Sequence, residues 1–243
     1  MTSFWCEEAW IGGRAVPSVA VEAGTDGKIT AIEVGVEAAN RDRLMGLVYP
    51  GLANAHSHAF HRALRGKAAA QGNFWTWREE MYRVADGLDP DSYRELATGV
   101  YREMALAGFT AVGEFHYLHH GPGGGRYANP NAMGEAIREA AASAGIRLTL
   151  LDTCYLEGGI GVELSPTQRR FADGSVEAWS ERRHLLPEDS NTRIGAAIHS
   201  VRAVRPDDLA RVASEAGGSP LHVHLSEQPA ENEAAQAAYG LSP

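Results

Sequence analysis

Hydrophobic and polar positions from about residue 48 onward follow a repeating pattern. Short apolar runs over 48–58, 109–115, 146–153, 193–199 and 220–225 predict five strands. Between them, apolar residues spaced three or four apart predict helices over 89–106, 131–144 and 206–216, and a further helix from Pro229. Strands that alternate with helices are typical of parallel βα units, either in an open sheet or in a closed barrel.

Two stretches within this pattern are less regular. Residues 74–84 hold several aromatic and basic side chains, and they predict a long connection or a short helix. Residues 157–187 are polar and mixed, and they predict a long insertion that contains a helix.

The first 48 residues predict short strands without helices. Apolar residues dominate 15–23 and roughly alternate over 28–34, and the Asp26-Gly27 pair between these runs is a hairpin signal. A sheet of this size is not stable alone. We therefore expect two domains, an N-terminal β portion over 1–48 and an α/β domain over 49–243.

Composition and charge restrict the class of partner. Hydrophobic residues make up 44% of the chain, as in globular proteins, and the net charge of -9 argues against nucleic acid as a partner. Cys6 and Cys154 are too few for a disulfide framework, which favours a reduced cytoplasmic setting. We see no secretory signal and no apolar segment long enough to cross a membrane, so we expect no membrane partner.

Histidines stand at the ends of the first and fifth predicted strands. His56 and His58 are two positions apart and share one face of a strand, and His224 belongs to a similar pair with His222. Because the carboxyl ends of parallel strands meet at one edge, these residues can converge. Three imidazoles without a nearby cysteine favour zinc, with another divalent metal as the alternative.

The surrounding polar residues have one functional and one structural interpretation each. Glu227 either transfers protons at the metal site or is an acidic residue in the first turn of a helix, and we favour the first. His222 is either a partner of the metal ligands or a core residue. Arg202, at a strand end, and Arg78 are candidates for binding a carboxylate. We expect solvent-facing or loop positions for His119, His120 and His184.

Several longer stretches resemble the amidohydrolase superfamily and, within it, the formimidoylglutamate deiminases. They are Pro50-Gly51-Leu52 with residues 54–64, then 74–79, 113–120, 199–204 and 222–228. The resemblance implies a (β/α)8 barrel beside a small β-sandwich, and one zinc ion per chain held by His56, His58 and His224. It also implies that Glu227 is the proton shuttle, and that the substrate pocket is lined by Arg78, Tyr117, His199, Arg202 and, at a family glutamine position, His61.

The activity implied by this resemblance is hydrolysis of a C–N bond in a linear amidine. N-formimidoyl-L-glutamate, a dicarboxylate, would be deiminated to N-formyl-L-glutamate and ammonia in histidine degradation, with a zinc-activated water as nucleophile. The alternatives are another aminohydrolase of this branch, such as a guanine or cytosine deaminase, and a metal-binding fragment without activity.

Two departures from the family pattern change the expectation for this chain. His61 replaces the usual glutamine, which affects one substrate contact. The family also continues beyond the fifth strand and supplies another histidine and a metal-binding aspartate, whereas the only carboxylates after Glu227 here are Glu231 and Glu233. We therefore expect a partial barrel of five βα units, an isolated chain with little or no activity, and a homodimer for the full-length form.

Overall fold

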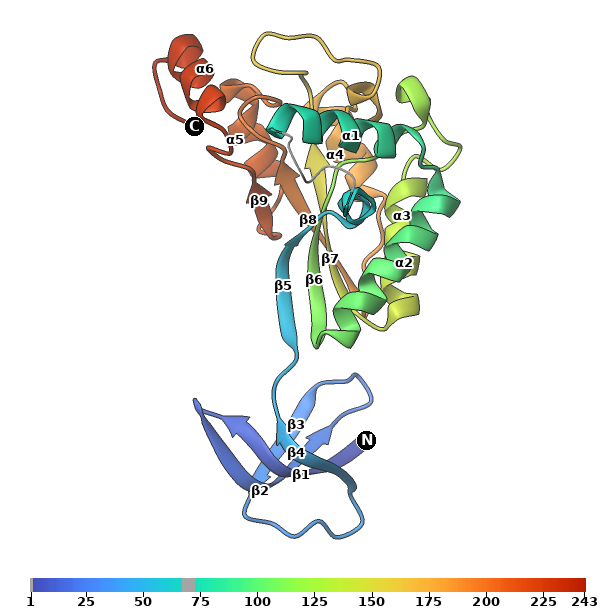
Figure 1. The fold of residues 1–243 in the computed structure, drawn as a ribbon, viewed down its shortest axis with the longest axis vertical. Coiled ribbons are helices and arrows are strands. Elements are labelled where there is room, and N and C mark those ends of the chain that lie inside the picture. Colours follow the sequence, from blue (N-terminus) through green and yellow to red (C-terminus); the bar gives the residue numbers. More distant parts are fainter. Residues whose placement is uncertain (1, 67–72) are drawn as a thin grey trace. The chain divides into compact units, whose positions relative to one another are not determined.

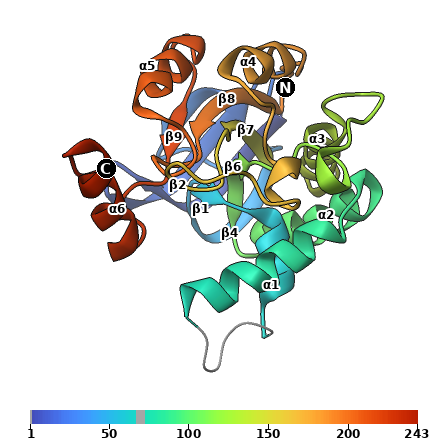
Figure 2. The same cartoon turned by 90° about the horizontal axis from the view of Figure 1, so that it is seen from above.

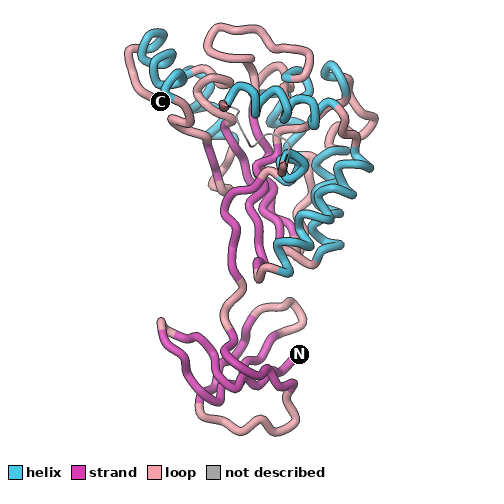
Figure 3. Tube along the Cα trace, in the orientation of Figure 1, coloured by secondary structure: helices cyan, strands magenta, loops and turns pink. Residues whose placement is uncertain are grey.

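The computed structural model describes residues 2–66 and 73–243 of the chain. They form two compact units, Met1–Leu52 and Ala53–Pro243. All the helices in the described part of the chain belong to the second unit (Figures 1 and 3). No helix in the described part is long and apolar enough to span a membrane.

The first unit is a four-stranded sheet with the order β3-β2-β1-β4. Its strands are β1 (Thr2–Ile11), β2 (Arg14–Ala23), β3 (Ile29–Val34) and β4 (Asp42–Val48). β1 and β2 form a hairpin whose turn is Gly12-Gly13, and both glycines have the positive φ angles that such tight turns require. The antiparallel pairing of β2 with β3 confirms the hairpin predicted at Asp26-Gly27, whereas the parallel pairing of β1 with β4 has no local sequence signal.

The second unit is built on a five-stranded sheet in which the strands follow chain order, from β5 to β9. The strands are β5 (Leu52–Ser57), β6 (Phe109–His116), β7 (Arg147–Cys154), β8 (Thr192–Ile198) and β9 (Leu221–Val223). The β6–β7, β7–β8 and β8–β9 ladders are parallel, and the sheet curls as part of a barrel wall. The predicted α/β class and partial barrel are thus confirmed.

The helices follow one another around the strands of this unit (Figure 2). They are α1 (Phe74–Asp86), α2 (Pro90–Leu106), α3 (Ala132–Ala144), α4 (Val176–His184), α5 (Pro206–Glu215) and α6 (Pro229–Tyr239), with short 3-10 turns η1 (Ala59–Leu64), η2 (Pro122–Gly124) and η3 (Gln168–Arg170). Where a connection or short helix is predicted over 74–84, the structure has the 13-residue helix α1, capped by Asn73, whose side chain accepts two backbone N–H bonds. A capping box at Asp89 likewise starts α2.

A continuous apolar core lies between the sheet and these helices. Its fully buried members include Tyr93 and Tyr101 from α2, Ile137 from α3, and Leu148 and Leu150 from β7. Successive residues of a strand point to opposite faces, so each strand presents one set of side chains to the helices and another to the concave face. The residues of the candidate site come from the concave set at the carboxyl ends of the strands.

Candidate functional site

Three histidine rings meet at the carboxyl ends of β5 and β9. His56 is on β5, His58 follows it, and His224 follows β9. The Nε2 atom of His224 lies 3.2 Å from Nε2 of His58 and 3.3 Å from Nε2 of His56. Nitrogen ligands about 2.0–2.1 Å from a tetrahedral zinc are separated by roughly 3.3 Å, so this spacing fits three ligands of one ion. The predicted convergence is confirmed, and ligation stays a prediction.

The three rings are held in the neutral form that a metal requires. Burial, followed by neighbouring histidines, lowers the pKa of His58 well below its ordinary value of 6.5 and lowers that of His224 to about 4. Burial also lowers the pKa of His56. The Nδ1–H of a neutral His58 donates to the carbonyl of Phe115 at 2.9 Å, which leaves the Nε2 lone pair directed at the cluster.

A pocket of about 600 Å³ opens in front of this cluster. Aromatic side chains contribute to its lining, among them Trp75 and Trp77 from α1, Tyr155 and Phe171. All nine residues predicted for the site line this pocket, namely His56, His58, His61, Arg78, Tyr117, His199, Arg202, His224 and Glu227. His222 is half-buried and is not among the described residues that line it.

His61 and Tyr117 form one polar pair within the pocket. The Nε2 atom of His61 lies 2.8 Å from the Tyr117 hydroxyl, and the His61 ring packs against that of His58 with centroids 4.5 Å apart. Burial, with smaller effects of His224 and His56, lowers the pKa of His61 to about 3. A neutral His61 can therefore accept a hydrogen bond or donate one, as the amide of a glutamine does.

His199, Arg78 and Arg202 occupy other parts of the pocket wall. His199 is held by the Ser200 hydroxyl, 3.1 Å from its Nδ1 atom. The guanidinium of Arg78 lies over Trp75, 4.4 Å from the ring centroid, and no ion pair to Arg78 exists among the described residues. Arg202, by contrast, donates to Glu227 at 2.5 Å. One of the two predicted carboxylate-binding arginines is thus already paired.

Glu231, on α6, is a pocket residue that the sequence reasoning did not identify. It is 1% exposed, and its Oε2 atom accepts the backbone N–H of Glu227 at 3.0 Å and lies 3.7 Å from Nε of Arg202. A glutamate two positions after the proline that begins a helix is a signal for a backward hydrogen bond to the N-cap, here Gln228, whereas the structure has the bond one residue earlier, at Glu227. That signal predicts a contact with the backbone but not the burial.

Glu114, on β6, is a second acidic residue that the sequence does not single out. It is fully buried, and its Oε1 atom accepts the N–H of Ala59 at 2.6 Å, one residue after His58. Burial raises the pKa of Glu114 to about 7, although the Ala59 N–H, Ser57 and Tyr101 act in the opposite direction. Glu114 therefore fixes the turn that follows the first histidine pair.

His119 and His120 lie in the loop after β6, which is one of their two predicted positions, but they do not face solvent. Both are 1% exposed, since each finds a buried acceptor: His119 Nε2 bonds the carbonyl of Thr153 at 2.9 Å, and His120 Nε2 bonds Asp173 at 2.9 Å. His184 is exposed at the end of α4, as predicted.

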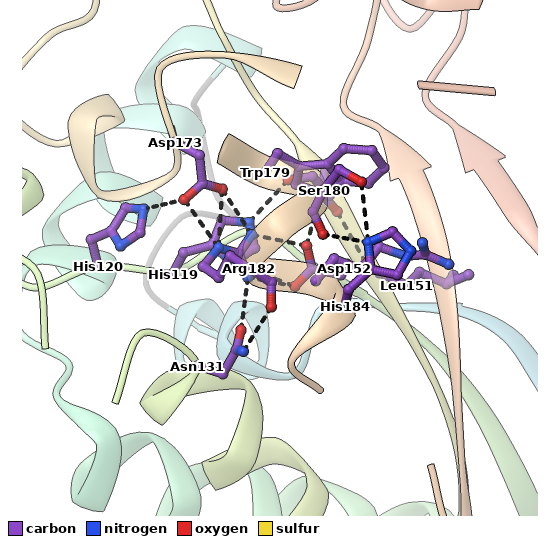
Figure 4. A network of polar contacts seen from close by, with 12 residues as sticks. His119, His120, Asn131, Leu151, Asp152, Asp173, Trp179, Ser180, Arg182 and His184 are labelled. Atoms are coloured by element: carbon purple, nitrogen blue, oxygen red, sulfur yellow. Dashed lines mark hydrogen bonds and ion pairs between the residues drawn. The ribbon is translucent and has the colours of Figure 1, made fainter. Parts of the chain in front are cut away.

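These histidines border a buried ion network between the sheet and the helices (Figure 4). We call it the Arg182 network, comprising Arg182, Asp152, Asp173, Asn131 and Trp179. His116, His119 and Asp152 within this region have ligand atoms close enough to suggest a second metal centre. Both oxygens of Asp152 accept from Arg182, however, at 2.8 and 2.9 Å. A fixed cation already occupies the carboxylate, so this cluster does not fit a metal.

Comparisons with known proteins agree with this geometry. Residues 47–242 match the amidohydrolase family model. The chain is 41% identical over 252 residues to formimidoylglutamate deiminase of Pseudomonas aeruginosa, with all of this chain and 55% of the relative covered. The chain therefore spans about half the length of that relative.

Solved structures resemble the fold over the same length. An amidohydrolase of Brucella melitensis superimposes with a TM-score of 0.88 and 35% identity, covering 100% of this chain and 56% of that one. An atrazine chlorohydrolase of Arthrobacter aurescens, solved with zinc and atraton, has a TM-score of 0.79 and 22% identity, covering 100% and 56%. The second likeness supports the fold alone.

Proposed function

This chain belongs to the amidohydrolase family, and from that premise we propose that it forms part of a zinc-dependent deiminase. The proposed substrate is N-formimidoyl-L-glutamate, which is hydrolysed to N-formyl-L-glutamate and ammonia. The identity to the Pseudomonas deiminase supports this choice. The observation that carries it is the set of converging histidine Nε2 atoms in a pocket that also holds two arginines.

The metal would be held by His56, His58 and His224, whose neutral rings and nitrogen spacing suit one zinc ion per chain. When bound, zinc lowers the pKa of a coordinated water towards about 7 and so supplies a nucleophile at neutral pH. Every other contribution comes from the side chains of the pocket.

The pocket residues bind the substrate and move the proton. Arg78 and Arg202 suit the two carboxylates of the substrate, because a guanidinium binds a carboxylate through paired hydrogen bonds. Glu227 lies at the same wall and would carry a proton to the departing nitrogen.

An aminohydrolase that acts on an uncharged planar base is the competing function, and the aromatic walls of the pocket favour it. Such a substrate has no carboxylate and gains nothing from the arginines. Replacing Arg202 or Arg78 by methionine should therefore raise KM for formimidoylglutamate much more than KM for a neutral amidine. Arg83→Met is the matched control, since Arg83 is on the same helix as Arg78 but pairs with Glu80.

The experiment measures metal content and ammonia release together. We would assay the zinc-loaded 243-residue chain, and the same chain extended by the part of the Pseudomonas relative beyond the matched region. Release of ammonia from formimidoylglutamate by the extended form supports the proposal. Release from guanine or cytosine but not from formimidoylglutamate would replace it with the competing function. Zinc bound without turnover of any of these substrates would leave a metal-binding fragment.

A further inference from the structure

Arg202 lies between two carboxyl groups of different exposure. Arg202 Nη2 donates a hydrogen bond to Glu227 Oε2 at 2.5 Å, and Arg202 Nε lies 3.7 Å from Glu231 Oε2. The Glu227 side chain is 37% exposed, whereas that of Glu231 is fully buried. One guanidinium therefore faces two carboxyl groups, of which only one is accessible to solvent.

Glu231 is the fixed partner of the two. Its Oε2 atom accepts the Glu227 backbone N–H, so the side chain is tied to the loop that precedes α6. The residue before Glu227, Ser226, has a φ of 54°, a conformation that costs a non-glycine residue free energy and needs support from its surroundings. The contact with Glu231 supplies such support immediately after the strained position. Glu231 is therefore a positioning residue for the backbone of Glu227.

Glu227 is the exchangeable partner. Its carboxyl group is held by the partly exposed ion pair with Arg202, and such a pair contributes about 1 kcal/mol or less. A ligand carboxylate that binds Arg202 would enter the position that the Glu227 carboxylate now occupies. Arg78 offers a guanidinium that no described carboxylate pairs with, so a dicarboxylate can bind there with its other end.

We propose that a substrate carboxylate and the Glu227 carboxylate compete for Arg202, so that binding of an anionic substrate frees Glu227 for proton transfer. The inference rests on the proposed function of this pocket and deepens it. Arg202 then selects the substrate twice. It binds the carboxylate, and it keeps Glu227 engaged whenever a neutral molecule occupies the pocket.

The test measures binding in the metal-free 243-residue chain, where no turnover occurs. Calorimetric titration with N-formyl-L-glutamate, the unreactive product, gives Kd for the wild type, for Glu227→Gln, for Arg202→Met and for the double variant. Glu233→Gln, an exposed residue on the same helix, is the control for net charge. N-butylformamide, which has no carboxylate, is the control for the ligand. Circular dichroism of each variant verifies folding.

The proposal expects Glu227→Gln to bind N-formyl-L-glutamate about fivefold more tightly, the factor set by a partly exposed ion pair. In the Arg202→Met background, Glu227→Gln should give no such gain. Glu233→Gln should bind N-formyl-L-glutamate as the wild type does, and Glu227→Gln should not change the binding of N-butylformamide. No gain in Glu227→Gln would overturn the competition but not the proposed function. An equal gain with Arg202 absent would also overturn it, because the effect would then be simple charge repulsion. A failure of every folded variant to bind N-formyl-L-glutamate would overturn both proposals.

Discussion

Arg182 is the buried cation of the Arg182 network, so its loss should strongly destabilise the second unit, and Arg182→Met tests this directly. The Arg182 side chain is 4% exposed and donates to Asp152 at 2.8 and 2.9 Å and to Asp173 at 2.8 and 3.0 Å. Methionine has nearly the same length but no charge. The variant therefore leaves the buried Asp152 without its paired arginine and with the Trp179 N–H as its donor, while Asp173 keeps Arg126 and His120.

The expected cost follows from the burial of those carboxylates. Removing one partner of a buried ion pair typically destabilises a protein by about 3–5 kcal/mol. Because whole domains are stable by only about 5–15 kcal/mol, the variant should be close to unfolding at neutral pH. Arg183→Met is the matched control. Arg183 is the next residue of α4 and equally buried, but it donates to the carbonyls of Gly195 and Glu215 and to the Ser219 hydroxyl, so its loss should cost only about 1–3 kcal/mol.

The stability lost in Arg182→Met should depend on pH. Burial acts to raise the pKa of Asp152, but the charge of Arg182 outweighs it and holds this pKa below its ordinary value. The pKa of Asp173 is likewise lowered, by His120 and Arg182 against the effect of burial. Two depressed pKa values mean that the stabilisation is complete above about pH 4 and is lost as pH falls further. The deficit of Arg182→Met should therefore shrink in acid, where the carboxylates protonate.

Urea unfolding followed by far-ultraviolet circular dichroism measures this difference, since the described helices all belong to the second unit. The reasoning would be refuted if Arg182→Met lost no more stability than Arg183→Met at neutral pH. It would also be refuted if the deficit of Arg182→Met stayed constant into acid.

Three further predictions concern the metal centre, Glu114 and the sheet edge. His224→Ala should weaken zinc binding more than about tenfold in a chelator competition, whereas the exposed His184→Ala should leave it unchanged. Glu114→Gln should gain stability over the wild type as pH rises, by roughly 2 kcal/mol between about pH 5 and 8, because the wild-type carboxyl ionises near its ordinary pKa of 4.5 in the unfolded chain but stays protonated up to about pH 7 in the folded one; a flat difference in thermal scans would contradict this. Val223→Lys should reduce self-association in sedimentation velocity, because Val223 is 43% exposed on the edge strand β9, and unchanged sedimentation would show that this edge is not the contact.

Much of the fold could be predicted because its signals are local. Alternating strands and amphipathic helices indicate the order of elements in the second unit, and strand ends indicate where His56, His58 and His224 lie. The parallel pairing of β1 with β4 could not be predicted, since it joins segments about 40 residues apart without a turn signal between them. The strand predicted over 220–225 is only three residues long in the structure, where β9 ends at Val223, just before His224.

The polar network was missed because burial is a property of the tertiary structure. Arg182, Arg183 and His184 form a basic run in the sequence, yet the two arginines point into the protein and the histidine out of it. His119 and His120 precede a glycine-rich loop, a pattern that predicts solvent-exposed positions. Their burial depends on Asp173 and Thr153, which come from distant parts of the chain. No local pattern marks a charge whose partner is 30 residues away, as Asp152 is from Arg182.

The position of this network explains why an ionic cluster rather than an apolar one fills that volume. Asp152 on β7 is paired in register with His116 on β6, and the preceding residue of β6, Phe115, stacks on His224 with ring centroids 4.0 Å apart. Adjacent residues of one strand thus contact the Arg182 network on one face and the histidine cluster on the other. Apolar packing is tolerant of small shifts, whereas the bidentate hydrogen bonds of Arg182 fix the direction and distance between β7, α4 and the loop that holds Asp173. A site that needs three nitrogens within about 3.3 Å of one another depends on strand ends held in this way.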